Sequence, residues 1–161
     1  MTTKRALPAC ARGRFEGPQS FAALVARTGG DWPDTVLEAI HGHPVLRHVD
    51  RRELRDGVLE VSARQAVELA ALISVGSLLY GPGESLRAPD AERDACLREV
   101  VRAAGDGARF LTNHGHAEYG EEADFLASSF HADVLAGPTI DICLLGVSDE
   151  NVLILWRFED D

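Results

Sequence analysis

Residues 62–80, SARQAVELAALISVGSLLY, decide the fold of this chain. Ser62 and Gln65 have the spacing at which each side chain bonds the backbone N–H of the other residue, so the pattern predicts a helix that begins at Ala63. The segment Gly81-Pro82-Gly83 predicts where this helix ends. Apolar residues cover more than one stripe of it, which is typical of a helix in the middle of a protein core.

The same segment does not predict a membrane span. Arg64, Glu68, Ser74 and Ser77 interrupt its apolar run, which falls short of the ~18 apolar residues that a span needs. The chain has 161 residues, of which 45% are hydrophobic and 26% are charged, and these values are typical of one globular domain. We therefore expect a folded domain that makes no contact with a membrane.

Residues 1–17 are predicted to form a basic N-terminal arm. A proline and a glycine interrupt any regular periodicity, and four basic residues precede the first acidic one: Lys4, Arg5, Arg12 and Arg14. Such a segment is expected to be loosely ordered. Residues 18–161 are expected to form a single α+β domain.

The first part of this domain is predicted to be mainly helical. Cap residues and glycines indicate helices that begin after Ser20, Asp31 and Asp50, and a further helix over residues 89–104. Acidic residues near the start of residues 120–131 predict one more helix there. Short strands are expected at residues 58–61 and 108–112.

The last thirty residues change their hydrophobic period. Residues 139–147 and 152–158 are β-branched and aromatic runs separated by the polar residues 148–151, which predicts a β-hairpin. Both faces of both strands are largely apolar, so we expect both to be covered, or one to be covered and the other used for binding. The predicted fold is α+β, with helices mainly in the first two thirds packed on a small antiparallel sheet that ends in this C-terminal hairpin.

The three cysteines, Cys10, Cys96 and Cys143, are an odd number and include no C-x-x-C pair. This pattern predicts neither a disulfide framework nor a thiolate zinc site, and it favours a reducing, cytoplasmic location. The N-terminal segment also lacks the apolar run of a signal peptide. Cys96 and Cys143 lie in predicted apolar surroundings, where a cysteine is usually an inert small hydrophobe.

A histidine-rich loop offers the only candidates for catalysis. His114, His116, Glu118 and Tyr119 lie close together in the sequence, as an acid–base cluster requires. Histidine with carboxylate is also the usual ligand set for zinc or iron, which makes His114, His116 and His131 weak metal candidates. Because glycine separates the first pair, these histidines fit a turn better than a metal-binding strand, and we predict no metal and no cofactor.

Other functional patterns are absent from the sequence. It contains no nucleophile elbow G-x-S-x-G, no phosphate loop and no dinucleotide-binding glycine turn. The basic arm alone suggests nucleic acid, but a net charge of −10 repels a polyanion, so no nucleic acid partner is predicted. Whether the protein is an enzyme and how many copies associate stay open.

The charge distribution favours a basic protein partner. Residues 117–161 hold eleven acidic residues against one arginine, so the negative charge is concentrated at this end of the chain. We expect a small acidic cytoplasmic binding protein, in the manner of an immunity protein or inhibitor that neutralises a basic partner. The predicted contact residues are Glu118, Glu121, Glu122, Asp124, Asp149 and Glu150. The alternatives are a small enzyme, metal-dependent or not, that uses residues 114–124, and a scaffold subunit that buries the two-faced hairpin.

Overall fold

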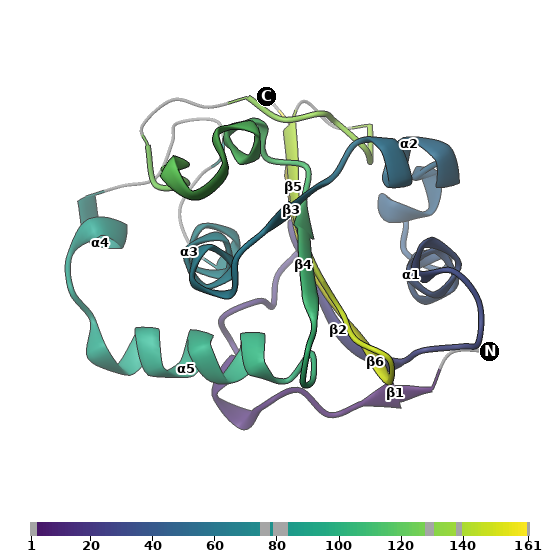
Figure 1. The fold of residues 1–161 in the computed structure, drawn as a ribbon, viewed down its shortest axis with the longest axis horizontal. Coiled ribbons are helices and arrows are strands. Elements are labelled where there is room, and N and C mark those ends of the chain that lie inside the picture. The colour runs from purple at the N-terminus through teal and green to yellow at the C-terminus, as the bar shows by residue number, and fades with distance from the viewer. Residues whose placement is uncertain (1–2, 75–77, 79–83, 128–130, 138–139, 161) are drawn as a thin grey trace.

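The computed structural model describes residues 3–74, 78, 84–127, 131–137 and 140–160. Within them, one antiparallel sheet stands between two groups of helices, and Figure 1 shows this sheet edge-on in the middle of the molecule. Helices α1 (Trp32–Ile40) and α2 (Arg51–Asp56) cover one face. Helices α3 (Ala63–Ser74), α4 (Glu84–Arg87) and α5 (Ala91–Arg102) lie on the other. The predicted α+β class is confirmed.

The sheet has the strand order β1-β2-β6-β5-β4-β3, and each neighbouring pair is antiparallel. The strands are β1 (Lys4–Arg5), β2 (Ser20–Ala26), β3 (Leu59–Val61), β4 (Arg109–Thr112), β5 (Ile140–Val147) and β6 (Asn151–Glu159). The predicted C-terminal hairpin is therefore confirmed as β5 and β6. It occupies the centre of the sheet, and each of its strands pairs with a further strand on its other edge.

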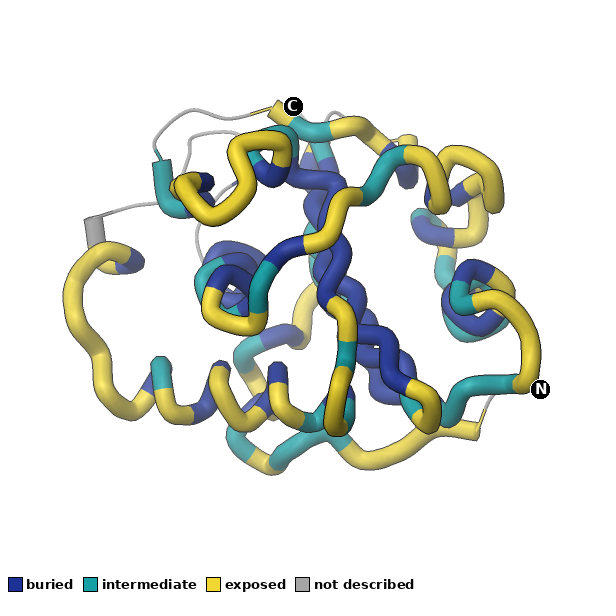
Figure 2. The backbone as a smooth tube through the Cα atoms, viewed as in Figure 1, coloured by how far each residue is buried: buried dark blue, intermediate teal, exposed yellow. Residues whose placement is uncertain are grey.

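The side chains of the central strands alternate between the two faces of the sheet and therefore contribute to two separate hydrophobic cores. Leu144 of β5 and Leu155 of β6 are paired and face α3 and α5, whereas the paired Leu145 and Ile154 face α1 and α2. Figure 2 shows these strands as an almost continuous buried column. Helices thus cover both faces of the hairpin, which is the first of the two alternatives that its two-sided apolar pattern allows. No two-faced hairpin surface is left for a scaffold contact in the part of the chain that the structure describes.

Three of the predicted capping signals, at Ser62, Asp50 and Asp90, correctly mark the starts of helices. Ser62 N–H donates to Gln65 Oε1 over 2.9 Å and Gln65 N–H donates to Ser62 Oγ over 3.1 Å, so the reciprocal cap of α3 is confirmed. Asp50 and Asp90 likewise accept backbone N–H groups at the starts of α2 and α5. The predicted end of α3, at Gly81-Pro82-Gly83, lies outside the described residues.

The helix predicted after Ser20 is wrong, because residues 20–26 form β2. Their apolar side chains alternate between the two cores, with Leu24 on the α3 side and Val25 on the α1 side. A seven-residue apolar run buried on both faces does not show the simple alternation of a half-exposed strand. Pairing with β6 along its whole length decides the conformation, so tertiary context overrides the local pattern.

The helix predicted for residues 120–131 is also wrong for residues 120–127 and 131, and residues 128–130 lie outside the described part of the chain. Short 3₁₀ turns, η3 (Gly115–Glu122), occur earlier, and Gly120 within them has a φ of 63°, which breaks a regular helix. Residues 123–127 that follow are irregular. The acidic residues that suggested a helix start are exposed: Glu121 and Glu122 lie in η3, and Asp124 lies in the irregular segment after it.

A disulfide joins Cys10 to Cys96, which corrects the expectation that the cysteines are unpaired. Their Cα atoms are 5.8 Å apart, within the range that a disulfide spans. The bond fixes η1 (Ala9–Ala11) to α5. The side chain of Phe15 is 3% exposed, so the segment before β2 contributes to the core on this side.

No helix in the described residues combines the length and the apolar composition that a membrane crossing requires.

Candidate functional site

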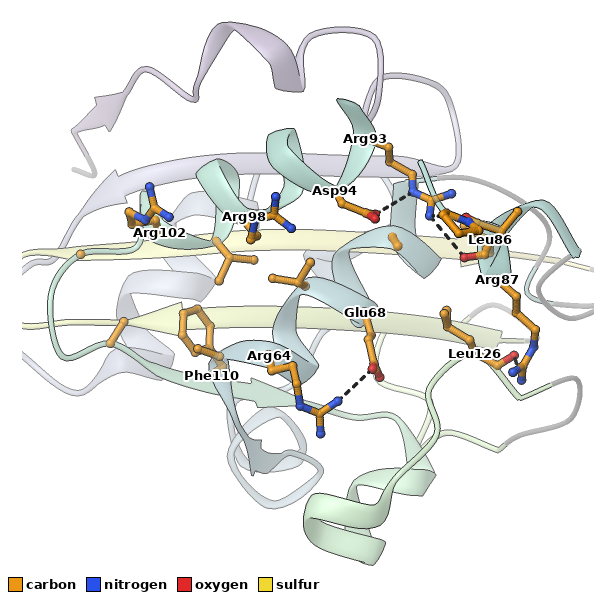
Figure 3. A pocket seen from close by; sticks show the side chains of 18 of the residues that line it. Arg64, Glu68, Leu86, Arg87, Arg93, Asp94, Arg98, Arg102, Phe110 and Leu126 are labelled. Atoms are coloured by element: carbon orange, nitrogen blue, oxygen red, sulfur yellow. Dashed lines mark hydrogen bonds and ion pairs between the residues drawn. The ribbon is translucent and has the colours of Figure 1, made fainter. Parts of the chain in front are cut away.

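A cavity of about 750 Å³ lies between α3 and α5 and is closed at one end by α4 (Figure 3). Its apolar surface comes from Val67 and Ala71 of α3, Val101 of α5, Phe110 of β4 and Leu126. A volume of ~300–1,000 Å³ with mainly apolar walls and a few charged groups is typical of a small-molecule site. This cavity is the strongest candidate for a functional site on the molecule.

Helical periodicity explains how the two helices form the walls. Residues 63, 67 and 71 repeat every four positions, so they follow one face of α3 toward α5. Asp94, Arg98 and Arg102 repeat in the same way along α5. Figure 3 shows the charged side chains of α5 along one side of the cavity and Arg64 and Glu68 of α3 along the other.

Five arginines line the cavity, although the chain has a net charge of −10. One of them, Arg93, has a structural role. Its guanidinium donates to the carbonyls of Ser85, Leu86 and Ala88 over 3.1–3.4 Å, and it also contacts Asp94. Arg93 is 9% exposed, so it fixes the end of α4 against α5 and supports the cavity wall.

Two further arginines are occupied by acidic neighbours. Arg64 bonds Glu68 over 3.1 Å and lies 3.9 Å from Glu121, while Arg87 pairs with Asp124 over 3.2 Å. Burial raises the pKa of Glu68, and Asp124 adds to this effect, while the nearby charge of Arg64 acts against it. These pairs reduce the positive charge that this end of the cavity presents.

Arg98 and Arg102 differ from the other three arginines. Neither makes a hydrogen bond or ion pair with another residue that the structure describes, and both are exposed. The third acidic residue of the lining, Asp106, is likewise exposed and without such a partner among the described residues. The cavity therefore keeps two uncompensated guanidinium groups near one uncompensated carboxylate.

The histidine-rich loop lies at the far end of β4. His114 is 2% exposed, caps η3 by accepting the His116 N–H at its Nδ1 over 3.1 Å, and packs edge-on against Phe125. Burial, with smaller contributions from His116 and His131, lowers the pKa of His114 to about 3. His114 is therefore buried and neutral at neutral pH, and it caps the turns of η3, which agrees with the turn position that the sequence favours.

His116 and His131 of the same loop region lie near His114. The ring of His116 lies 5.0 Å from that of His114, 6.3 Å from that of His131 and 5.5 Å from that of Tyr119. A Cβ atom on Gly115 would clash with the His131 ring, so a larger residue at this position would require that ring to move. Among the residues that the structure describes, no three histidine, cysteine or carboxylate side chains are placed to hold a metal ion.

Two of the catalytic candidates face away from any enclosure. Glu118 and Tyr119 are exposed in η3, and 58% of the Tyr119 surface is accessible. Neither lines the cavity between α3 and α5. The loop therefore brings His114, His116 and Tyr119 together without enclosing a space in which a substrate would be shielded from water.

The six acidic residues predicted to contact a partner are all exposed, but they form two groups. Glu118, Glu121, Glu122 and Asp124 lie in η3 and just after it. Asp149 and Glu150 lie in the turn after Val147, which pairs with Arg109 at the start of β4, whereas η3 follows the other end of β4. The two groups therefore lie at opposite ends of the sheet.

Two other members of the acidic C-terminal part are buried. Asp141 is fully buried and accepts the Trp156 indole N–H over 2.7 Å, and Glu159 is 5% exposed and accepts the Leu78 N–H over 2.7 Å. Burial raises the pKa of Asp141, although three N–H donors oppose this effect. The surface is therefore less acidic than the sequence composition suggests.

Sequence reasoning did not find the cavity. Its only local signal was the four-residue repeat of Asp94, Arg98 and Arg102 along α5, which is also typical of an exposed helix face. In the structure Asp94 pairs with Arg93, and Arg98 has no partner among the described residues. The separation of α3 from α5 creates the cavity, and local periodicity carries no information on that distance.

No protein-family model, no curated protein and no solved structure matches the chain.

Proposed function

We propose that the protein binds a small molecule with a substantial apolar part in the cavity between α3 and α5. The observation that supports this proposal is the cavity itself, with its volume of about 750 Å³ and its mainly apolar lining. Burying apolar ligand area contributes ~25 cal/mol per Å² before the costs of association. A ligand of about ten carbon atoms would therefore gain useful affinity here.

The surrounding contacts favour a preformed site. Arg93 holds the end of α4 through three backbone carbonyls, and Val101 and Phe110 are buried in the core behind the cavity. A wall that is already ordered loses little conformational entropy when a ligand binds.

The test is a titration with a neutral fluorescent probe, N-phenyl-1-naphthylamine, whose emission rises when it leaves water. We expect saturable binding with one site. Val67→Trp places a larger side chain in the cavity and should weaken the binding at least about tenfold. The matched control is Leu59→Trp, because Leu59 is 50% exposed on β3 and does not line the cavity. Equal binding by wild type and Val67→Trp would contradict the proposal.

A second function rests on the acidic group in η3. Glu118, Glu121 and Glu122 are exposed together, and such a surface attracts a basic protein and speeds its association. In this proposal the molecule is an immunity protein or inhibitor that covers a basic partner. Because the two acidic groups lie at opposite ends of the sheet, we assign the contact to the η3 group alone.

This second proposal needs the partner, captured by pull-down from the source cell. Changing Glu121, Glu122 and Asp124 together to lysine should slow association at least about tenfold at low ionic strength, and salt should reduce the difference. The control is the double change of Asp149 and Glu150 to lysine at the opposite end of the sheet. If the captured partner is acidic, or both variants associate at the wild-type rate, the electrostatic proposal is wrong.

A further inference from the structure

We infer that the ligand of the cavity is an anionic amphiphile, a carboxylate or phosphate head group on an apolar body of about ten carbon atoms. This inference rests on the proposed function, and it adds the charge of the ligand and the residues that recognise it. Arg98 and Arg102 bind the head group, and the apolar body lies against Val67, Val101 and Phe110.

Two guanidinium groups of the cavity lining have no partner among the described residues. Arg98 and Arg102 are four residues apart on one face of α5, which places them as neighbours along the helix. Neither has a hydrogen bond or ion pair within the described part of the chain, so their donors are available to a ligand. The guanidinium fork matches the geometry of carboxylate and phosphate oxygens, which makes two adjacent arginines a suitable site for an anion.

The other charges of the cavity are largely compensated within the protein. Glu68 bonds Arg64, Asp94 contacts Arg93, and Arg87 pairs with Asp124. Asp106 is the acidic residue that opposes an anionic ligand, and it follows α5 beyond Arg102. Two arginines against one carboxylate leave an excess of positive charge on this side of the cavity.

The apolar lining of the cavity indicates that the rest of the ligand, beyond its head group, is apolar. Val101 lies one helical turn from Arg98 and next to Arg102, so the apolar wall begins immediately beside the two charges. The cavity then continues past Val67 toward Leu86 and Leu126 at its other end. A small inorganic anion would leave this surface in contact with water, whereas an amphiphile covers it.

The test compares four ligands with the same ten-carbon chain: decanoate, decyl phosphate, decan-1-ol and decyltrimethylammonium. Each competes with N-phenyl-1-naphthylamine at a concentration below that at which it forms micelles. Decanoate and decyl phosphate distinguish the two head groups. Both anions should bind at least about tenfold more tightly than the alcohol, as expected for charge-assisted hydrogen bonds, and the cation should bind most weakly.

Three variants assign the effect to named residues. Arg98→Gln and Arg102→Gln should each weaken decanoate binding about tenfold and leave decan-1-ol binding unchanged, because glutamine is polar but removes the positive charge and the guanidinium fork. Asp106→Asn should tighten decanoate, since it removes the opposing charge. The matched control is Arg52→Gln, an exposed arginine of α2 on the other side of the sheet.

The outcomes separate the two claims. If decan-1-ol binds as tightly as decanoate, or if both arginine variants bind decanoate like the wild type, the charge inference is wrong. The proposed function still stands in that case, provided that the probe binds the wild type and that Val67→Trp weakens this binding at least about tenfold. If no probe or ligand binds the wild type, the proposed function fails and this inference fails with it.

Discussion

Trp156 donates its indole N–H to Oδ2 of Asp141 over 2.7 Å, and both residues are fully buried on neighbouring strands in the centre of the sheet. The other carboxylate oxygen of Asp141 accepts the backbone N–H of Leu135 over 2.8 Å and that of Ala136 over 3.4 Å. This carboxylate therefore fixes the segment before β5 to the sheet. It belongs to the stability of the fold and takes no part in an acidic binding surface.

Asp141→Asn should destabilise the protein by about 1–3 kcal/mol, because asparagine has one acceptor oxygen and turns an N–H₂ group toward a buried donor. Urea unfolding measures this loss. Trp156→Phe provides the control. It removes the indole N–H, so the N–H₂ group of an asparagine at position 141 no longer faces a buried donor. The cost of Asp141→Asn should be smaller in the Trp156→Phe background, and strictly additive effects would show that the two residues are not coupled.

Burial of neutral His114 should make stability depend on pH. Its pKa is lowered from 6.5 to about 3 in the folded protein, so the unfolded chain binds the proton more readily. The stability associated with this histidine is present above pH 6.5 and is lost as the pH falls from 6.5 toward 3. At ~1.4 kcal/mol per pH unit, about 2 kcal/mol should be lost between pH 7.5 and pH 5.

His114→Asn tests this dependence, since asparagine accepts an N–H at a helix cap but does not titrate in this range. Urea unfolding at several pH values should give a shallower dependence for this variant than for wild type. The control is His41→Asn, because His41 is exposed at the end of α1. Parallel pH profiles for wild type and His114→Asn would contradict the assignment.

Leu72 should lie among the residues most sensitive to truncation. It is 1% exposed at the centre of the core between α3 and the sheet, so Leu72→Ala should cost about 2–5 kcal/mol in free energy of unfolding. The matched control is Leu59→Ala on the exposed edge strand, which should cost about 0.5 kcal/mol or less. A loss below about 1 kcal/mol at Leu72 would mean that α3 is not the central core helix.

Features that depend on neighbouring residues were predictable from the sequence. The reciprocal cap of Ser62 and Gln65 and the hairpin of residues 140–159 were found because each rests on a short spacing rule. β2 was not, since its conformation depends on pairing with β6, more than a hundred residues away. The Cys10–Cys96 bond, with a sequence separation of 86, was missed for the same reason.

The candidate site was less predictable than the fold. The histidine loop was identified by its residue types, but burial decides that His114 is neutral, and burial depends on the packing of Phe125. Arg98 and Arg102 are not distinguishable in the sequence from the chain's other arginines. Their importance depends on which acidic residues lie near them and on the cavity beside them, and both are properties of the folded arrangement.

The most direct test of the central claim is to locate the ligand on the protein. In a titration of ¹⁵N-labelled protein with decanoate, backbone amide shifts should change together over residues 63–71 and 94–102 and at Phe110, and the amides of α1 and α2 should not respond. Such a map would place the ligand between α3 and α5. Shift changes confined to the α1 and α2 face, or no saturable change at all, would contradict the account.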